Sequence, residues 1–374
     1  MMKITDIEAI RLQSPPFSEA IRPAWTPGGT WTHLSSGLIK VTTDEGIVGW
    51  GAASPQDLPK VTEVLKPMLV GKDPFALEQH ARVFRNAGGA WGAEIALWDI
   101  IGKAVGQPLF RLWGAYQDRV PAYASCIETR SGERRGEDAE QARAAGWRAM
   151  KLRLHDWTMK EDIAQVEGVR RAMGDDFVIL ADANQAQQPG TPQPEEGPIW
   201  TYERAVQTAR ELERLGVYWL EEPLDRYDFA GLRRLCAAVD ILIAGGENNR
   251  GLHEFRTMIE DDVYDILQPE ALVTETMSGL RKIAGLAEMY HKRVAPHHGG
   301  GGVGIAAHLH LACAIPNGSY FELLHEPPGM SADDFQWYMQ EPIRVDADGN
   351  VAAPTGPGLG VEPDPDKIAR YRVG

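Results

Sequence analysis

The sequence contains few cysteines and no long apolar run. Of its 374 residues only Cys126, Cys236 and Cys313 are cysteine, and they stand too far apart to form a metal-binding motif. We therefore expect buried thiols in a reducing compartment. No basic-then-apolar segment is found near residue 1, and no apolar stretch reaches the length of about 18 residues that a membrane span needs. The sequence thus predicts neither a signal peptide nor a membrane span, and a cytoplasmic location.

Positive charge is also scarce. The chain has 38 Lys and Arg against 53 Asp and Glu, which gives a net charge of −15. This excess of negative charge argues against nucleic acid and against an anionic membrane surface as partners. A small acidic substrate remains compatible with it, because a local cationic pocket can reverse the field.

The chain lacks the paired glycine-rich phosphate turns, or a switch-point motif, that a doubly wound open sheet would need. From about Tyr123 short apolar runs alternate with helical patterns, which predicts eight strands near 121–126, 149–155, 177–184, 217–223, 241–247, 264–270, 293–298 and 320–325. Eight such units in about 200 residues indicate a TIM-type (β/α) barrel, whose sites lie at the C-terminal ends of the strands.

The first part of the chain follows a different pattern. Residues 3–12 alternate like a strand, 38–51 read as a hairpin with Asp-Glu-Gly as its turn, and 61–114 are helical. We therefore expect an α+β capping domain over residues 1–120, a barrel over 121–343, and a Pro- and Gly-rich segment, 344–374, that returns to pack on the capping domain.

Three apolar runs of similar form each end in an acid. The runs 177–181, 217–220 and 241–246 precede Asp182, Glu221 and Glu247, and each is typical of a strand buried on both faces. If these strands are parallel neighbours, the three carboxylates meet at one end of the sheet and repel one another unless a cation sits between them. Hard oxygen ligands favour Mg²⁺ over Zn²⁺. The alternative is three solvated or helix-capping acids.

Cationic residues occur on a neighbouring strand. Period-two alternation places Lys151, Arg153 and His155 on one face and Leu152 and Leu154 on the other. Cations in the barrel mouth would offset the charge of the three acids and allow an acidic substrate to bind. The alternative is that they only balance the acids.

A histidine ends the seventh predicted strand. His297 precedes four glycines, Gly299–Gly302, and is a candidate proton carrier near neutral pH. Glu270, at the end of the sixth strand, would hydrogen-bond the imidazole and raise its pKa. Glu322 on the eighth strand is a further acid near the same mouth, which either hydrogen-bonds a developing enolate or holds a lysine. The alternative for His297 is a structural role.

A divalent cation on a substrate carboxylate, flanked by bases, suits removal of the α-proton, because the enediolate formed is stabilised when its charge appears. A lysine base on one side and a histidine base on the other would allow racemisation. The same groups would allow elimination, with His297 as the acid that expels a β-hydroxyl as water.

The chain resembles the enolase superfamily, mandelate racemase subgroup, over nearly its whole length. The motifs that carry the resemblance occur in family order: the N-terminal hairpin, Ala96-Leu97-Trp98-Asp99, Asp182-Ala183-Asn184, Glu221-Glu222-Pro223, Gly245-Gly246-Glu247, Gln268-Pro269-Glu270 and Pro296-His297. The resemblance implies a capping domain, a modified barrel with Mg²⁺, and a homo-oligomer. By position it implies metal ligands at Asp182, Glu221 and Glu247, a basic pair at Lys151 and Arg153, a dyad of His297 and Glu270, and the strand-eight acid Glu322.

Two departures from the family pattern bear on the reaction. Arg153 stands where racemases usually have a lysine base, and arginine stays protonated near neutral pH. Glu270 stands where aspartate is usual, and its extra methylene can shift the imidazole of His297. The first departure favours dehydration of an acid sugar, an aldonate or aldarate, to a 2-keto-3-deoxy acid. An epimerase or lactone cycloisomerase is the second interpretation, and a barrel retained for binding without turnover is the third.

Two loops are candidates for substrate recognition. The non-periodic stretch 14–36 contains Trp25 and Trp31, which either close over a polyhydroxy acid or only pack the cap on the barrel. The Pro- and Gln-rich stretch 185–200 either lines the pocket or forms an oligomer contact. We expect substrate contacts from Arg22, Trp25, His33, His155, Asn184 and His298.

Overall fold

The computed structural model describes residues 1–186 and 198–373. Most of the stretch 185–200, which we expected to line the pocket or to form an oligomer contact, therefore lies outside the described residues. No helix in the described part of the chain has the length and apolar character needed to cross a bilayer.

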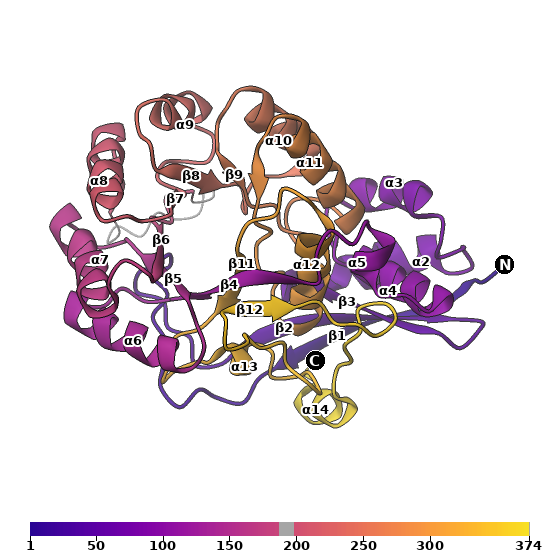
Figure 1. Ribbon diagram of the computed structural model, residues 1–374. Coiled ribbons are helices and arrows are strands. Elements are labelled where there is room, and N and C mark those ends of the chain that lie inside the picture. The colour runs from indigo at the N-terminus through magenta and orange to yellow at the C-terminus, as the bar shows by residue number, and fades with distance from the viewer. Residues whose placement is uncertain (187–197, 374) are drawn as a thin grey trace.

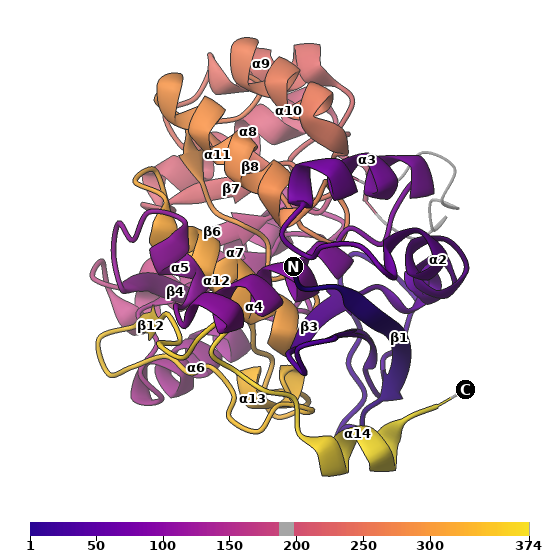
Figure 2. The ribbon, with the colours of Figure 1, turned by 90° about the vertical axis from the view of Figure 1, so that its right-hand side faces the viewer.

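The N-terminal region is a three-stranded antiparallel sheet covered by helices (Figures 1 and 2). The predicted hairpin is present, and Gly46 turns it with a φ of 78°. Helix α4 packs closely on β3, because a Cβ at Gly49 would lie 2.1 Å from the carbonyl oxygen of Ala96. The elements are β1 (Ile4–Gln13), β2 (Ser35–Thr43), β3 (Val48–Ala53), a 3-10 turn (Pro55–Asp57), α1 (Leu58–Lys60), a π-turn (Val61–Leu65), α2 (Lys66–Leu69), α3 (Leu77–Ala87), α4 (Ala93–Val105) and α5 (Leu109–Leu112).

Eight parallel strands follow, one in each predicted range, in the order β10-β9-β8-β7-β6-β5-β4-β11. The sheet curls so that its edges meet at a bridge between Val294 and Gly318, while the helices between the strands cover its outside (Figure 1). The predicted barrel fold with its N-terminal cap is confirmed. The strands are β4 (Arg119–Ser125), β5 (Ala149–Arg153), β6 (Val178–Asp182), β7 (Trp219–Glu221), β8 (Leu242–Gly245), β9 (Ile266–Leu267), β10 (Arg293–Val294) and β11 (Phe321–Leu324).

Local sequence signals set the helices between these strands. Helix α7 begins at a capping box in which Thr158 Oγ1 accepts from the Glu161 N–H and the Glu161 carboxylate accepts from the Thr158 N–H. The helices are α6 (Gly132–Ala144), α7 (Met159–Met173), α8 (Tyr202–Arg214), α9 (Phe229–Cys236), α10 (Gly251–Glu260), α11 (Met277–Met289) and α12 (Gly302–Ala314).

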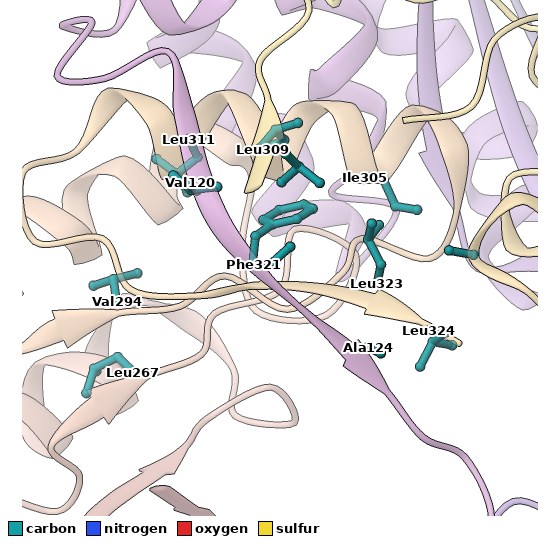
Figure 3. Close-up of a cluster of buried hydrophobic side chains, with 14 of the residues drawn as sticks. Val120, Ala124, Leu267, Val294, Ile305, Leu309, Leu311, Phe321, Leu323 and Leu324 are labelled. Atoms are coloured by element: carbon teal, nitrogen blue, oxygen red, sulfur yellow. The ribbon is translucent and has the colours of Figure 1, made fainter. Parts of the chain in front are cut away.

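Helix α12 is buried along its whole length. Ile305 and Leu309 lie over Phe321 and Leu323 of β11, and Leu311 lies beside Val120 of β4 (Figure 3). A helix that is apolar on all sides belongs inside a core rather than at its surface. It therefore fixes β11 and β4 relative to the cap, with which α12 also packs through α5.

The C-terminal segment runs back from the barrel to the first sheet (Figure 2). Strand β12 (Asn350–Ala352) pairs antiparallel with β4, and α14 (Pro365–Tyr371) lies against β1; a short helix, α13 (Ala332–Phe335), precedes both. Near its end, Arg372 forms a bridge with Leu12 and an ion pair of 2.7 Å with Glu8.

Candidate active site

The charged residues lie where three consecutive parallel strands end. The sheet register pairs Arg153 of β5 with Asp182 of β6, and Asp182 with Glu221 of β7. All three side chains are buried, as is Lys151 two residues before Arg153. Because side chains two apart along a strand share a face, the strands bring both cations against both acids.

Lys151 lies between three carboxylates. Its Nζ is 2.7 Å from Glu221 Oε1, 2.9 Å from Glu322 Oε1 and 3.5 Å from Asp182 Oδ2. Burial by itself would lower the pKa of Lys151, but the nearby charges of Glu221 and Glu322 raise it well above the ordinary value. As the chain is folded here, Lys151 is therefore an ammonium ion.

Arg153 uses its whole guanidinium group. Its Nε donates to the Cys126 carbonyl at 2.7 Å, one terminal nitrogen donates to Asp182 and to Asn184 Oδ1, and the other donates to Ser125 Oγ at 3.1 Å. The Trp25 ring of the cap loop covers it, with the guanidinium carbon 4.6 Å from the ring centroid. Arg153 is thus a fixed cation that joins the cap loop to three strand ends.

His297 and Glu270 form the predicted pair. His297 Nδ1 lies 2.7 Å from Glu270 Oε2, and its Nε2 lies 3.1 Å from Glu247 Oε2 and 3.6 Å from Glu322 Oε2. Burial alone would lower the pKa of His297, but Glu247, Glu322 and Glu270 raise it to about 10. Burial would likewise raise the pKa of Glu270, yet the histidines around it hold that pKa well below the ordinary value.

The three predicted metal ligands each contact a cationic side chain. Asp182 bonds Arg153, Glu221 bonds Lys151, and Glu247 faces His297. Burial and the charge of Asp182 raise the pKa of Glu221 to about 8, and burial also raises that of Glu247. The charge of Asp182 therefore acts on both glutamates.

The donor set fits a divalent cation such as Mg²⁺, because the buried carboxylates of Asp182 and Glu221 and the partly buried one of Glu247 supply hard oxygen ligands at one mouth. In the folded chain their oxygens do not all lie within 4.8 Å of one another. Among the described residues the group that meets this distance is Glu270, His297 and His298.

The predicted substrate contacts are divided between the site and its surroundings. Asn184 lies in the site, where its N–H and its Nδ2 both donate to Asp182, at 2.8 and 3.1 Å. The ring of His298 lies against that of His297, with centroids 3.9 Å apart and the planes tilted by 36°. Trp25 covers Arg153, and His155 bonds the carbonyl of Ala183, the residue after Asp182. The described bonds of the other two lie elsewhere: the main chain of Arg22 bonds Glu128, and His33 bonds Thr32.

Backbone strain occurs beside two of the acids. Asn184 has a φ of 48° and Glu222 a φ of 45°, both positive values that residues with a Cβ seldom adopt. Glu222 is buried, and Asn248 Nδ2 donates both to it and to Glu247. Such strain tends to be retained where the surrounding structure fixes functional groups.

Three site residues were missed from the sequence. Ser125 Oγ donates to Glu322 Oε1 at 2.6 Å, Trp219 Nε1 donates to Glu221 Oε2 at 3.1 Å, and Tyr123 lies with its ring centroid 5.4 Å from Lys151 Nζ. The alternation rule that placed Lys151 and Arg153 together would have placed Tyr123 and Ser125 on the inner face of β4.

Comparisons with known proteins bear on the whole chain. The family described as Mandelate racemase / muconate lactonizing enzyme, N-terminal domain, matches residues 8–114, and the family described as Enolase C-terminal domain-like matches residues 134–367.

Two curated relatives and one solved structure illustrate the range of activities. Arabinonate dehydratase of Saccharolobus solfataricus is 28% identical over 341 residues, 86% of each chain. D-galactarolactone cycloisomerase of Agrobacterium fabrum is 29% identical over 364 residues, 90% of this chain and 91% of that one. A mutant L-talarate/galactarate dehydratase liganded with Mg and L-glucarate superposes with a TM-score of 0.85 at 25% identity, over 100% of this chain and 92% of that one.

Other relatives are named as dehydratases, a cycloisomerase and an epimerase. The homologues are thus acid-sugar lyases together with isomerases, and a solved homologue contains magnesium. Two family matches that together span most of the sequence, on a barrel with its cap, establish the relationship. The chain belongs to the mandelate racemase / muconate lactonizing enzyme family of the enolase superfamily.

Proposed function

We propose that the protein is a Mg²⁺-dependent dehydratase of an acid sugar, an aldonate or aldarate, which it converts to a 2-keto-3-deoxy acid. The proposal rests on one observation: only one side of the site has a side chain that can act as a base. One side has His297 backed by Glu270, and the other has Arg153, whose three nitrogens each donate to a protein acceptor. A racemase needs a competent base on each side, and an arginine in this position is a poor base.

Burial lowers the pKa of His297, but Glu247 and Glu322 raise it to about 10, and a dication held by the three predicted metal ligands would offset these charges and favour the neutral imidazole. In the proposed reaction the neutral His297 Nε2 accepts the α-proton, and the electron pair of the C–H bond enters the enediolate. Glu270 keeps its bond to Nδ1, which fixes the tautomer and stabilises the imidazolium. His297 then returns the proton to the β-hydroxyl, the C–O bond breaks, and water leaves. The enol that remains tautomerises to the 2-keto-3-deoxy acid, so that the net change is loss of one water.

Asp182, Glu221 and Glu247 are the residues that would hold the Mg²⁺. When bound, the ion supplies positive charge beside the substrate carboxylate, which offsets the negative charge that develops there. Lys151 donates from between Glu221 and Glu322 and adds a second positive charge on the same side. Trp25 over Arg153 excludes water from that wall of the site.

A lactone cycloisomerase is the second candidate, favoured by the full-length similarity to D-galactarolactone cycloisomerase. It uses the same first step, removal of the α-proton by His297. The two candidates differ only in whether the group that leaves the β-carbon is water or a ring oxygen.

A panel of acid sugars and their lactones, assayed with Mg²⁺, separates the candidates. Semicarbazide detection of a keto acid from an open-chain acid sugar supports the dehydratase. Ring opening of a lactone without release of water supports the cycloisomerase. Incorporation of solvent deuterium at the α-carbon of every acid sugar, with no keto acid formed, would overturn the dehydratase.

Two variants test the assigned roles. His297→Asn should lower kcat by about 10²- to 10⁴-fold, the usual contribution of a general base, with KM little changed. Glu221→Gln should abolish turnover and lower the affinity for Mg²⁺ while the fold is retained. Normal turnover by Glu221→Gln would refute the metal assignment, and an unchanged kcat in His297→Asn would transfer the role of base to another residue.

A further inference from the structure

Both carboxylate oxygens of Glu270, the acid paired with His297, accept hydrogen bonds. Glu270 Oε2 accepts from His297 Nδ1 at 2.7 Å and from the Gly299 N–H at 2.9 Å. Glu270 Oε1 accepts from the Leu272 N–H at 3.0 Å and lies 3.3 Å from Nε2 of His308. His308 comes from the buried helix α12, and no pattern in the sequence connects it with the site.

The ring of His308 is fixed by its neighbours. It is fully buried, and its Nδ1 lies 2.8 Å from the carbonyl oxygen of Gly304, one helical turn earlier. A carbonyl only accepts, so Nδ1 carries the hydrogen. Nε2 therefore has a lone pair, which accepts from the Ala271 N–H at 2.9 Å, one residue after Glu270. His308 therefore contacts both the carboxylate and the main chain of the dyad acid.

The glycines after His298 pack against this ring. Gly299 has a φ of 77°, and a Cβ there would lie 2.4 Å from His308 Nδ1. A Cβ at Gly304 would lie 1.7 Å from the Gly299 carbonyl oxygen. The loop and the first turn of α12 are thus in close contact, which places the Gly299 N–H on Glu270 and leaves His308 no room to rotate away.

We propose that His308 is a positioning residue: through the Ala271 N–H it fixes the main chain next to Glu270, and its ring closes the space behind the carboxylate, which keeps Glu270 against His297 Nδ1 and so sets the direction of His297 Nε2. A glutamate has one more rotatable bond than the aspartate usual in the family, and a longer side chain needs a support on its far side to keep a single conformation. His308 supplies that support from behind. The proposal rests on the proposed function for its effect on turnover, but the contact itself does not.

Two substitutions separate the two ring nitrogens of His308. In His308→Asn the amide retains a donor near Nδ1 for Gly304 and leaves the Nε2 position empty. In His308→Gln the longer amide places its oxygen near Nε2, where it accepts from the Ala271 N–H. We expect His308→Asn to lower kcat by about 10- to 100-fold with KM little changed, the range for loss of a partner that orients a functional histidine. His308→Gln should recover most of that loss.

The decisive readout does not depend on turnover. In chain labelled with ¹⁵N-histidine, the downfield resonance of the His297 Nδ1 hydrogen reports its bond to Glu270, and its absence in His297→Asn assigns it. We expect this resonance to shift or broaden in His308→Asn and to return in His308→Gln. If no acid sugar is turned over but the resonance behaves in this way, the proposed function fails while the positioning role stands.

A resonance that is unchanged in folded His308→Asn, whatever its melting temperature, would overturn the proposal. If His308→Asn does not fold, Glu270→Asp provides the second test, since a shorter acid withdraws its carboxylate from His308. Glu270→Asp should then make the resonance insensitive to a further His308→Gln substitution. If His308→Gln shifts the resonance as much in Glu270→Asp as it does in the wild type, the proposal is also overturned.

Discussion

Arg153 illustrates how one residue type decides the chemistry of a position. Its guanidinium donates in three directions, to the Cys126 carbonyl, to Asp182 and to Ser125. The planar fork of arginine spreads its donors over three nitrogens, whereas lysine has a single donor nitrogen that could not reach all three of these acceptors. The position thus holds a structural cation, which agrees with the proposal that His297 carries the proton chemistry.

Arg153→Lys should therefore destabilise the protein although the charge is kept. Leaving buried acceptors without a donor costs about 1–3 kcal/mol, and the free energy of unfolding in urea should fall by that amount. Arg143→Lys, at an exposed site on α6, is the matched control and should change it little. Equal stability of the two variants would show that the guanidinium bonds contribute nothing.

The part of the site that lies at strand ends, or alternates along a strand, could be predicted from the sequence. Asp182, Glu221 and Glu247 follow apolar runs, so their common edge could be inferred from βα periodicity. His308 could not be found in this way, because a histidine on an all-apolar helix is indistinguishable from a core residue. Its contact with Glu270 depends on how α12 packs, and packing between distant segments leaves no local pattern.

At the scale of elements, one acid joins the ends of two strands and a helix. Glu326, which follows β11, accepts from the main-chain N–H groups of Ile127 and Glu128 beyond β4, at 2.6 and 2.8 Å. It also accepts from both terminal nitrogens of Arg135 on α6, at 2.8 and 2.9 Å. Although burial would raise its pKa, Arg135 lowers it to about 2.

This contact should make stability depend on acid pH. The ordinary pKa of glutamate is about 4.3, and the folded value is lower, so ionised Glu326 stabilises the fold fully above about pH 5. That contribution is lost as the pH falls toward 2. The difference in unfolding free energy between wild type and Glu326→Gln should therefore be largest at pH 6 and shrink by pH 3. For the exposed Glu63→Gln the difference should stay near zero, and a pH-independent difference for Glu326→Gln would contradict the assignment.

The glycine loop offers a second test at this scale. Gly304→Ala places a Cβ 1.7 Å from the Gly299 carbonyl oxygen, so the loop or the helix must move, and we expect a loss of about 2 kcal/mol or more. Gly285, also within a helix, has nothing within 4 Å of a Cβ. Gly285→Ala should stabilise α11 by up to about 1 kcal/mol. Thermal unfolding of the two variants compares them, and the same sign for both would refute the close packing.

At the scale of the whole molecule, the barrel and the cap could be predicted, whereas their junction could not. The turn of α4 that contains Asp99 fits a helix pattern, but nothing local shows that its carboxylate accepts from the N–H groups of Trp50 and Leu359. These bonds join the hairpin, the helix and the C-terminal segment. They depend on residues that lie up to 260 positions apart.

Binding of Mg²⁺ should stabilise the whole fold. A ligand that binds only the folded state, at about 100 times its Kd, adds about 2.7 kcal/mol. Differential scanning calorimetry should show a higher Tm with Mg²⁺, reversed by EDTA, and little response in Glu221→Gln. Glu63→Gln should respond like the wild type. An equal response of Glu221→Gln would place the ion elsewhere.

The return of the C-terminal segment to the first sheet has a consequence for biosynthesis. Leu12 is paired with Arg372, and the Trp50 indole donates to Glu362 at 2.9 Å. The hairpin therefore leaves the ribosome more than 300 residues before its last partners do. The cap is completed only after translation has passed Arg372, so in the nascent chain one edge of its sheet stays uncovered, where chaperones have access to it.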